Sequence, residues 1–496
     1  MIQQSLRLDW GNAIAPECTA QRDNDAIPHP GTRIMNAPVA PSLLAKKDVA
    51  NHFHPYTNLR AIETDAPLMI VEGDGVEVID DAGKRYIEGM AGLWCASLGF
   101  SEKRLGEAAK RQMDVLPYYH SFSGKAHNVV AEVSEKLISL APTQALRDGR
   151  VLFANSGSEA NDTAFKLVRY YHNAIGKPQK KKIIARVKGY HGVTLATASL
   201  SGIPAMHQHF DLPIDGVLRA GCPHPYLFAK DGEAPGQFAT RLADELEALI
   251  VSEGADTIGA FIAEPVQGAG GVIVPPPTYF EKIQAVLKRH EILFIADEVI
   301  TGFGRTGNRF GTDTYALQPD MLSTAKMITS AYVPFSALYV SNKIYQACAD
   351  ASASVGVFGH GYTYSGHPLG CAVALETLKI YEERDIIGHV RNVAPALQQG
   401  LRAFADHPLV GDARGVGLIA AIELAEDKHA RKPFDPKRAV GPYLVRRAQA
   451  HGLILRAMGG DMIAFSPPLI ITEPQIKEML RRFSMALDDT AAWLVA

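Results

Sequence analysis

Residues 292–305 read ILFIADEVITGFGR, and residues 319–332 read PDMLSTAKMITSAY. The first stretch opens with five apolar residues that lead directly to Asp297, and the second runs through a short apolar segment to Lys326. A short apolar run of this kind predicts a strand that is buried on both faces of a sheet. In open α/β sheets, ligands bind beyond the carboxyl ends of such strands. A buried acid and a buried lysine at these positions need partners, and a cofactor with a cationic nitrogen and an aldehyde would pair both.

Two other motifs overlap this region. The spacing Gly302-x-Gly304-x-x-Gly307 matches a dinucleotide fingerprint, but it begins several residues after the strand and no helical period follows it. The pair Ser323-x-x-Lys326 matches the nucleophile motif of penicillin-binding enzymes, but the chain has neither Ser-Asp-Asn nor Lys-Thr-Gly. Both matches lack the context that their chemistry requires.

The segments 294–307 and 326–334 resemble the class III aminotransferases, which are pyridoxal-phosphate enzymes of fold type I. The resemblance runs from about His52 to the C-terminus and is greatest to the ω-amine:pyruvate transaminases. It implies that Lys326 binds the cofactor aldehyde covalently and that Asp297 binds the pyridine nitrogen. Lys188, beside a flexible turn, is a weaker candidate for the covalent lysine.

Residues 155–162, NSGSEAND, follow the short apolar segment 151–153 and precede a helical apolar period. A Ser-Gly-Ser turn at the start of a helix presents N–H groups that can bind an anion, although an ordinary serine cap has the same sequence. The resemblance implies that Gly157 and Ser158 bind the cofactor phosphate.

Other motifs of the family supply the remaining cofactor contacts. The resemblance implies that Tyr190 covers one face of the cofactor ring and that Val299 packs against the other. It also places His191 and Glu264 at the cofactor, and Gln267 as a support of the ring hydroxyl.

The segment 359–368, GHGYTYSGHP, resembles the family segment that reaches the neighbouring subunit. It implies that Thr363, with Tyr362 beside it, binds the partner's cofactor phosphate. We therefore expect a homodimer with shared active sites, which could pair further into a tetramer.

The substrate contacts implied by the resemblance are Phe53, Trp94, Tyr190 and Arg456. A tryptophan is more often a core residue, and an arginine is more often solvated. Arg456, however, follows the apolar segment 453–455, which predicts a position at a buried edge. In the family, this arginine swings to meet a substrate carboxylate.

Some positions depart from the family pattern. Ile300 stands where the ornithine and 4-aminobutyrate branches commonly have glutamine, which favours the amine:pyruvate branch. Ala331, Phe335 and Ser336 also differ from the usual residues, and we expect them to narrow the loop next to the cofactor.

Length and composition set the remaining expectations. A chain of 496 residues with 47% hydrophobic and 21% charged residues predicts a globular protein of two or three domains. A net charge of −3 gives no case for nucleic-acid or membrane binding. Five scattered cysteines without a CxxC pair predict free thiols in a reducing cytoplasm. The His52/His54 and Cys222/His224 pairs lack a third ligand at metal spacing, so no metal is expected.

We expect an α/β fold with a mostly parallel central sheet, helices on both faces and a smaller α+β domain. Residues 1–34 form an extension, 35–90 contribute to the small domain, 91–345 form the large cofactor domain and 346–496 the C-terminal small domain. Within these, 69–88 predict an antiparallel meander. The expected reaction transfers an amino group from a primary amine, ω-amino acid or polyamine to pyruvate by a ping-pong mechanism. Alternatives are a decarboxylase or aminomutase on the same fold, and a non-catalytic binding protein.

Overall fold

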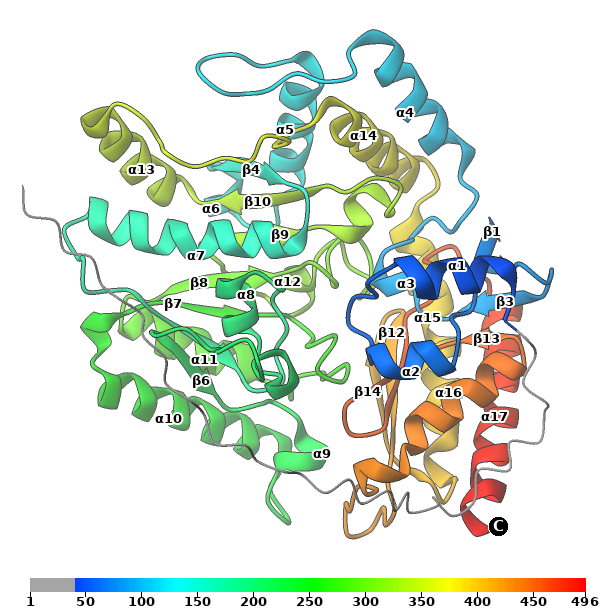
Figure 1. Cartoon of the computed structure of the whole chain (residues 1–496). Helices are drawn as coiled ribbons and strands as arrows, with labels where there is room; N and C mark the ends of the chain where they lie inside the picture. Colours follow the sequence, from blue (N-terminus) through cyan, green and yellow to red (C-terminus); the bar gives the residue numbers. More distant parts are fainter. Residues whose placement is uncertain (1–40) are drawn as a thin grey trace, which may run out of the picture. The chain divides into compact units, whose positions relative to one another are not determined.

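The computed structural model describes residues 41–496 (Figure 1). The chain divides into two compact units, of which the first ends at Leu68 and the second spans Met69–Ala496. The first unit contains the helices α1 (Leu43–Asn51) and α2 (Leu59–Thr64). Ser42 caps α1 by accepting the backbone N–H of Ala45 at 3.1 Å. The expected extension, residues 1–34, lies outside the described residues.

The second unit is built on a seven-stranded sheet with the order β4-β10-β9-β8-β7-β5-β6. Every pairing among β5 to β9 is parallel, and β10 alone runs antiparallel to its neighbours β4 and β9. The expected mostly parallel α/β sheet is therefore confirmed. The strands are β4 (Arg150–Ala154), β5 (Lys182–Arg186), β6 (Val217–Ala220), β7 (Ile258–Ala263), β8 (Leu293–Asp297), β9 (Met321–Thr324) and β10 (Ser336–Val340).

Helices cover both faces of this sheet because its central strands are apolar at every position. All residues of β7 and β8 are buried, which agrees with their unbroken apolar sequence. Phe261 and Phe294 pack on one face against α10 (Pro235–Glu253) and α11 (Tyr279–Arg289). Ile262 and Ile295 point to the other face, where α7 (Gly157–Ala174) and α13 (Asn342–Val355) lie.

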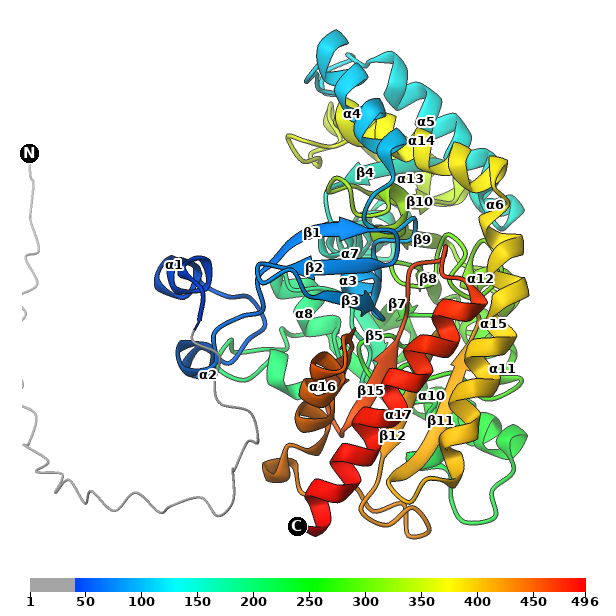
Figure 2. The same cartoon turned by 90° about the vertical axis from the view of Figure 1, so that its right-hand side faces the viewer.

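Two smaller sheets complete the second unit. The expected meander is formed by β1 (Ile70–Asp74), β2 (Glu77–Asp80) and β3 (Arg85–Glu88), and β13 (Leu453–Ile454) pairs parallel with β3. The second sheet is antiparallel, with the order β11-β12-β15-β14. Its strands are β11 (Val410–Val416), β12 (Ile419–Leu424), β14 (Arg456–Met458) and β15 (Met462–Phe465). The helices α15 (Ile386–Arg402) and α17 (Glu473–Val495) lie along it (Figure 2).

The pairing of β13 with β3 ties residues of the N-terminal meander to the C-terminal part of the chain. The predicted boundary at residue 345 falls inside α13, so the domain limits stay a prediction. No helix within residues 41–496 has the length and apolar character needed to cross a membrane. The other helices of the second unit are α3 (Ala91–Trp94), α4 (Lys103–Val115), α5 (Asn128–Leu140), α6 (Gln144–Arg147), α8 (Leu195–Leu200), α9 (Pro225–Phe228), α12 (Gly311–Thr314), α14 (Pro368–Glu383) and α16 (Val440–Ala450), with short 3-10 turns at Pro204–Met206, Ala255–Thr257, Lys326–Thr329, Ala403–Asp406 and Pro436–Arg438.

Candidate active site

A cavity of about 360 Å³ opens at the carboxyl ends of β7, β8 and β9. Its lining brings together residues from loops that are far apart in the sequence, as open parallel sheets do at this edge. Eight of the residues that the sequence nominated meet there: Gly157, Ser158, Tyr190, His191, Glu264, Asp297, Val299 and Lys326.

Asp297 forms the acidic end of the cavity. Its side chain is 3% exposed, and Oδ2 lies 2.8 Å from Nδ1 of His191. The amide Nδ2 of Asn161 donates to the same Oδ2 at 2.7 Å, and the N–H of Val299 donates to Oδ1 at 3.1 Å. Since a carboxylate only accepts hydrogen bonds, the His191 Nδ1 must carry a proton in this contact. These three contacts hold the side chain of Asp297 in one orientation.

Asn161 lines the cavity but was not nominated from the sequence. It stands one turn into α7, four residues after Gly157, and it also donates to the backbone carbonyl of His191 at 2.9 Å. The residues around Asn161 in the sequence do not mark it as a site residue. Only its position four residues after Gly157, on the same face of the helix, could have indicated that it reaches the cavity.

The N-terminus of α7 forms the opposite end. Ser156 caps this 18-residue helix by accepting the N–H of Glu159 at 3.2 Å. The first N–H groups of a helix have no partner within the helix, and they favour an anion there. A Cβ on Gly157 would lie 2.9 Å from two side-chain carbons of Val299, so only glycine fits that approach. A Cβ on Gly192 would similarly lie 2.6 Å from Oγ of Ser158.

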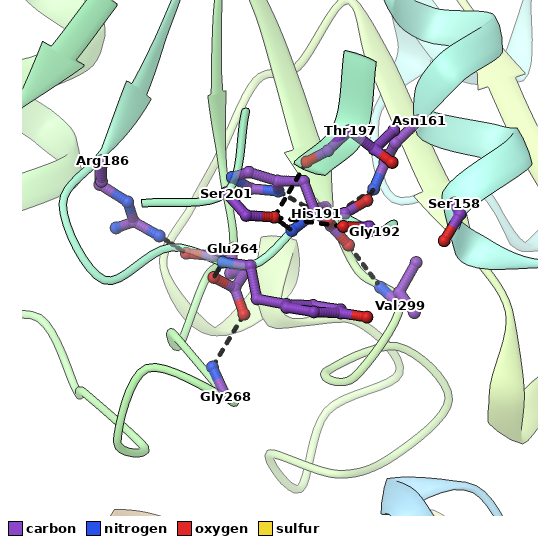
Figure 3. Close-up of polar contacts among 12 residues, drawn as sticks. Ser158, Asn161, Arg186, His191, Gly192, Thr197, Ser201, Glu264, Gly268 and Val299 are labelled. Atoms are coloured by element: carbon purple, nitrogen blue, oxygen red, sulfur yellow. Dashed lines mark hydrogen bonds and ion pairs between the residues drawn. The ribbon is translucent and has the colours of Figure 1, made fainter. Parts of the chain in front are cut away.

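Glu264 joins the two loops that border the cavity (Figure 3). Its Oε1 accepts the N–H of Tyr190 at 3.0 Å, and its Oε2 accepts the N–H of Gly268 at 2.8 Å. Burial raises the pKa of this carboxyl above its ordinary value. Nη2 of the buried Arg186 donates to the backbone carbonyl of Glu264, which fixes the end of β7. The amide of Gln267 donates to the Val187 carbonyl, and its contact with a ring hydroxyl stays a prediction.

Lys326 lines the cavity from the turn that follows β9. Its φ of 52° is in the left-handed region, which turns the chain sharply at this residue. The expectation of a buried lysine is wrong, because Lys326 is half-buried at the cavity wall. Lys188 is not among the residues that line the cavity. Burial lowers its pKa, and the charged groups near it include Glu423 and Arg414, on β12 and β11.

The departures from the family pattern lie in and beside the cavity wall. Ile300 lines it, and a Cβ on Gly268 would lie 2.4 Å from the Ile300 Cδ1 atom. Ala331 and Phe335 also line it, and the Phe335 ring stacks on Phe153 with 5.3 Å between centroids. Ser336 is buried within β10. Apolar surface therefore faces the cavity at the positions that differ.

Trp94 and Arg456 lie together beside this cavity. The guanidinium carbon of Arg456 is 5.3 Å from the centre of the Trp94 ring, within cation–π range. Trp94 is 3% exposed, and its indole Nε1 has no hydrogen-bond partner among the described residues. Neither residue is among those that line the cavity in residues 41–496. Phe53 belongs to the N-terminal unit, between α1 and α2, and the substrate contacts of all three stay predictions.

Tyr362 and Thr363 do not line the cavity of their own chain within residues 41–496. The Tyr362 hydroxyl donates to the Glu159 carbonyl at 3.2 Å, near the start of α7. Thr363 is exposed, and its carbonyl accepts the Tyr118 hydroxyl at 2.9 Å. That Tyr362 and Thr363 contact the cofactor phosphate of a partner subunit stays a prediction.

The His52/His54 pair and His224 have acidic neighbours that sequence spacing did not reveal. Asp48 lies beside His52 and His54 in the N-terminal unit, with 3.2 Å between Oδ1 and the His52 Nδ1. Asp412 and Glu423 approach the buried His224. Each of these two carboxylates has an oxygen 2.7 Å from Nη1 of Arg414, so one guanidinium already pairs with both of them.

The sheet, the anchored aspartate and the cavity lysine define an enzyme of the pyridoxal-phosphate fold type I class. The family model named "Aminotransferase class-III" matches residues 60–487, and the chain belongs to this family. A gamma-aminobutyrate transaminase 1 of Oryza sativa subsp. indica, named as mitochondrial, is 51% identical over 424 residues, or 86% of this chain and 82% of that protein.

Two solved structures are closely similar. The omega transaminase of Pseudomonas jessenii in complex with PMP has a TM-score of 0.89 and 52% identity, covering 91% of this chain and 99% of that chain. A transaminase with L-alanine has a TM-score of 0.84 and 53% identity, covering 86% of this chain and all of that chain.

The protein is a pyridoxal-phosphate-dependent transaminase, and its own residues fit the cofactor. The glycine-lined helix N-terminus fits a phosphate, and the buried Asp297 fits a cationic ring nitrogen. Lys326 supplies an amine on the same cavity.

Proposed function

We propose that this transaminase moves the amino group of a primary amine, an ω-amino acid or a polyamine to pyruvate, giving an aldehyde or ketone and alanine. The observation that carries the proposal is the position of Arg456. Its guanidinium lies over Trp94, and the next residue, Cys95, is close enough to Lys326 to feel its charge. Burial raises the pKa of the Cys95 thiol, and the Lys326 ammonium opposes that effect. These contacts support a role of the Arg456 guanidinium as the group that binds the substrate carboxylate.

The apolar wall supports an amine donor. Val299, Ile300, Val333 and Phe335 all line the cavity. An uncharged amine side chain gains free energy by leaving water at such a surface, whereas a carboxylate loses it. A second kind of site is therefore required for the keto acid, and Arg456 provides it.

One arginine can serve both halves of a two-step reaction. A guanidinium pairs with a carboxylate through two parallel hydrogen bonds. When an amine without a carboxylate is bound, the ring of Trp94 offers the guanidinium a favourable position. The relatives support both partners, because one is named for gamma-aminobutyrate and another holds L-alanine, the amino product of pyruvate.

The residues that line the cavity have different roles in the proposed reaction. Pyridoxal phosphate, when bound, supplies an aldehyde that combines with amines and a ring that accepts an electron pair. Lys326 takes the proton from the carbon that bears the substrate's amino group. Asp297, held by His191 and Asn161, stabilises a positive charge on a ring nitrogen. Tyr190 and Val299, which both line the cavity, would confine the planar ring of the cofactor.

A homodimer with shared active sites is part of the proposal. It rests on the exposure of Thr363 and on the place of Tyr362 beside α7. A cytoplasmic location remains a prediction from the free thiols, and the rice relative is named as mitochondrial.

The test measures the two half-reactions separately. Stopped-flow spectra follow the pyridoxamine form of the enzyme with pyruvate, and the pyridoxal form with an apolar monoamine. Truncating one partner of a buried charged pair costs roughly 2–5 kcal/mol, so Arg456→Ala should slow the pyruvate half-reaction by about 30-fold or more. The monoamine half-reaction should change by less than about threefold, because no carboxylate takes part.

Arg446 is a matched control, since its guanidinium lies 6.0 Å from the Tyr443 ring on α16. Arg446→Ala should leave both half-reactions unchanged. Equal losses in both half-reactions of Arg456→Ala would mean that this residue supports the fold. A wild-type enzyme that forms no alanine from pyruvate, or that releases carbon dioxide or a rearranged amine, would overturn the proposed reaction.

A further inference from the structure

Glu88 ends strand β3 and carries a buried carboxylate, 4% exposed. Its Oε2 accepts two backbone N–H groups of the following turn, from Met90 at 3.2 Å and from Gly92 at 2.6 Å. Both bonds go to the same oxygen, so a single side chain ties the two backbone N–H groups of the turn together.

The turn needs such support because its backbone is unfavourable. Ala91 has a φ of 47°, Gly92 of 69° and Trp94 of 61°. A side chain rarely adopts the left-handed region, and such residues persist when the surroundings hold them in place. The N–H groups that Glu88 binds flank Ala91 directly.

Trp94 is the last residue of this turn, and its side chain is buried. Its ring packs in a buried cluster that includes Ile300 and Met458, and its other neighbour is the Arg456 guanidinium at 5.3 Å. The φ of 61° at Trp94 sets the direction of its Cα–Cβ bond, from which the ring extends into this cluster. A different backbone would aim the indole elsewhere.

The segment on either side of the turn is tied to both functional ends of the site. The N–H of Gly89 donates to the carbonyl of Ile454 at 2.9 Å, two residues before Arg456. The N–H of Leu98 donates to Oγ of Ser330 at 2.9 Å, four residues after Lys326. The turn therefore lies between the strand that carries the arginine and the loop that carries the lysine.

We infer that Glu88 is a positioning residue: its carboxylate holds the turn in which Trp94 presents its ring to the guanidinium of Arg456. Through this contact Glu88 sets where Arg456 stands when a carboxylate substrate arrives. The kinetic consequence rests on the proposed function, whereas the placement of Trp94 does not.

The first measurement reports on Trp94 alone, in the holoenzyme. The chain has three tryptophans, and Trp10→Phe with Trp493→Phe leaves only Trp94 to fluoresce. In that background, acrylamide should quench the buried indole weakly. Loss of both acceptor contacts in Glu88→Ala should raise the quenching constant by about twofold or more, since unpaired N–H groups reorganise the turn. Glu88→Gln keeps an amide oxygen and should restore most of the protection.

The second measurement uses the same two half-reactions. Glu88→Ala should reduce the rate with pyruvate by about tenfold, and the rate with a monoamine by less than about threefold. Asp80→Asn is the matched control. Asp80 is a buried carboxylate of the same meander, 6% exposed, and accepts the N–H groups of Ala82 and Lys84 at 3.0 and 2.9 Å. It should change neither the ratio of the two rates nor the quenching.

Unchanged quenching in Glu88→Ala would overturn the inference. So would an equal loss in both half-reactions in a folded Glu88→Gln or Glu88→Ala enzyme, because it would show a structural role only. If the wild-type enzyme does not accept pyruvate, the proposed reaction fails, and the quenching experiment still decides the role of Glu88.

Discussion

The carboxylate of Asp297 and the imidazole of His191 form a buried pair, with 2.8 Å between Oδ2 and Nδ1. A charge buried at the end of β8 is costly unless a partner compensates for it. His191 and Asn161 supply that compensation before any cofactor is considered. The site is thus organised around an anion that is already oriented for a cationic ring nitrogen.

Asp297→Asn removes this charge with little change of volume. We expect turnover to fall at least about a hundredfold, or roughly 2.7 kcal/mol of barrier, because the ring nitrogen loses its anionic partner. Steady-state kinetics at saturating cofactor measure the effect. A variant within about threefold of wild type would identify Asp297 as a structural acid.

Asn161→Ala should weaken the same anchor. Its Nδ2 donates to a charged oxygen at 2.7 Å, and a bond of this kind contributes about 1.5–3 kcal/mol. We expect a loss of about tenfold or more in turnover, with the cofactor still bound. Asn308→Ala is the control, because Asn308 donates instead to Thr314, at 3.0 Å. Equal effects of the two substitutions would argue against a role of Asn161 at the anion.

Asp297 could be predicted as a site residue from the sequence, whereas Asn161 could not. The unbroken apolar runs of β7 and β8 predicted buried parallel strands and an acid at the ligand edge, and the structure has both. Asn161 enters the site only because the end of β8 packs beside the first turn of α7. That approach is a tertiary contact, which no local period records.

Other features of the structure were also missed because they depend on tertiary contacts. The strand end predicted a buried Lys326, but the lysine stands at a cavity wall that a single segment cannot define. Asp48 lies one helical turn from His52, and Asp412 and Glu423 reach His224 from strands nearly 200 residues away, as the fold dictates. The domain limits, the partner contacts of Thr363 and the substrate contacts of Phe53 remain predictions.

Glu88 should make stability depend on pH. Burial raises the pKa of this carboxyl to about 7, against an ordinary 4.5, while the Met90 and Gly92 amides and Arg305 oppose the shift. The folded protein therefore binds this proton more tightly than the unfolded chain. The stabilisation is complete below pH 4.5 and is lost as the pH rises through 7, by about 3 kcal/mol.

Glu88→Gln removes this titration. Relative to wild type, its thermal midpoint should rise between pH 5 and pH 8. Asp80→Asn should shift the midpoint by the same amount at both pH values: burial raises the pKa of Asp80, but hydrogen bonds from Tyr86, Lys84 and Ala82 outweigh it and hold the pKa below its ordinary 3.8, so this carboxyl titrates below the range compared. Calorimetry at both pH values makes the comparison. A Glu88→Gln difference that is constant with pH would show that Glu88 does not titrate in this range.

The proposed homodimer with shared active sites predicts that cofactor retention depends on association of the two subunits. Thr363→Ala should raise the dissociation constant of the cofactor by about tenfold, the effect of one lost hydrogen bond to a charged phosphate. Thr240→Ala, on the exposed face of α10, should have no effect. Equilibrium dialysis and sedimentation test both points. A stable monomer that is saturated with cofactor and fully active would remove the shared site.

We predict that Lys326 holds the cofactor in the cavity that Asp297 also lines. Borohydride reduction of the holoenzyme makes the cofactor–lysine bond permanent, and peptide mass spectrometry then locates it. We predict that the added mass lies on the peptide that contains Lys326. Both this mass and the visible cofactor band should disappear in Lys326→Ala. A modified Lys188, or a full cofactor band in Lys326→Ala, would contradict it.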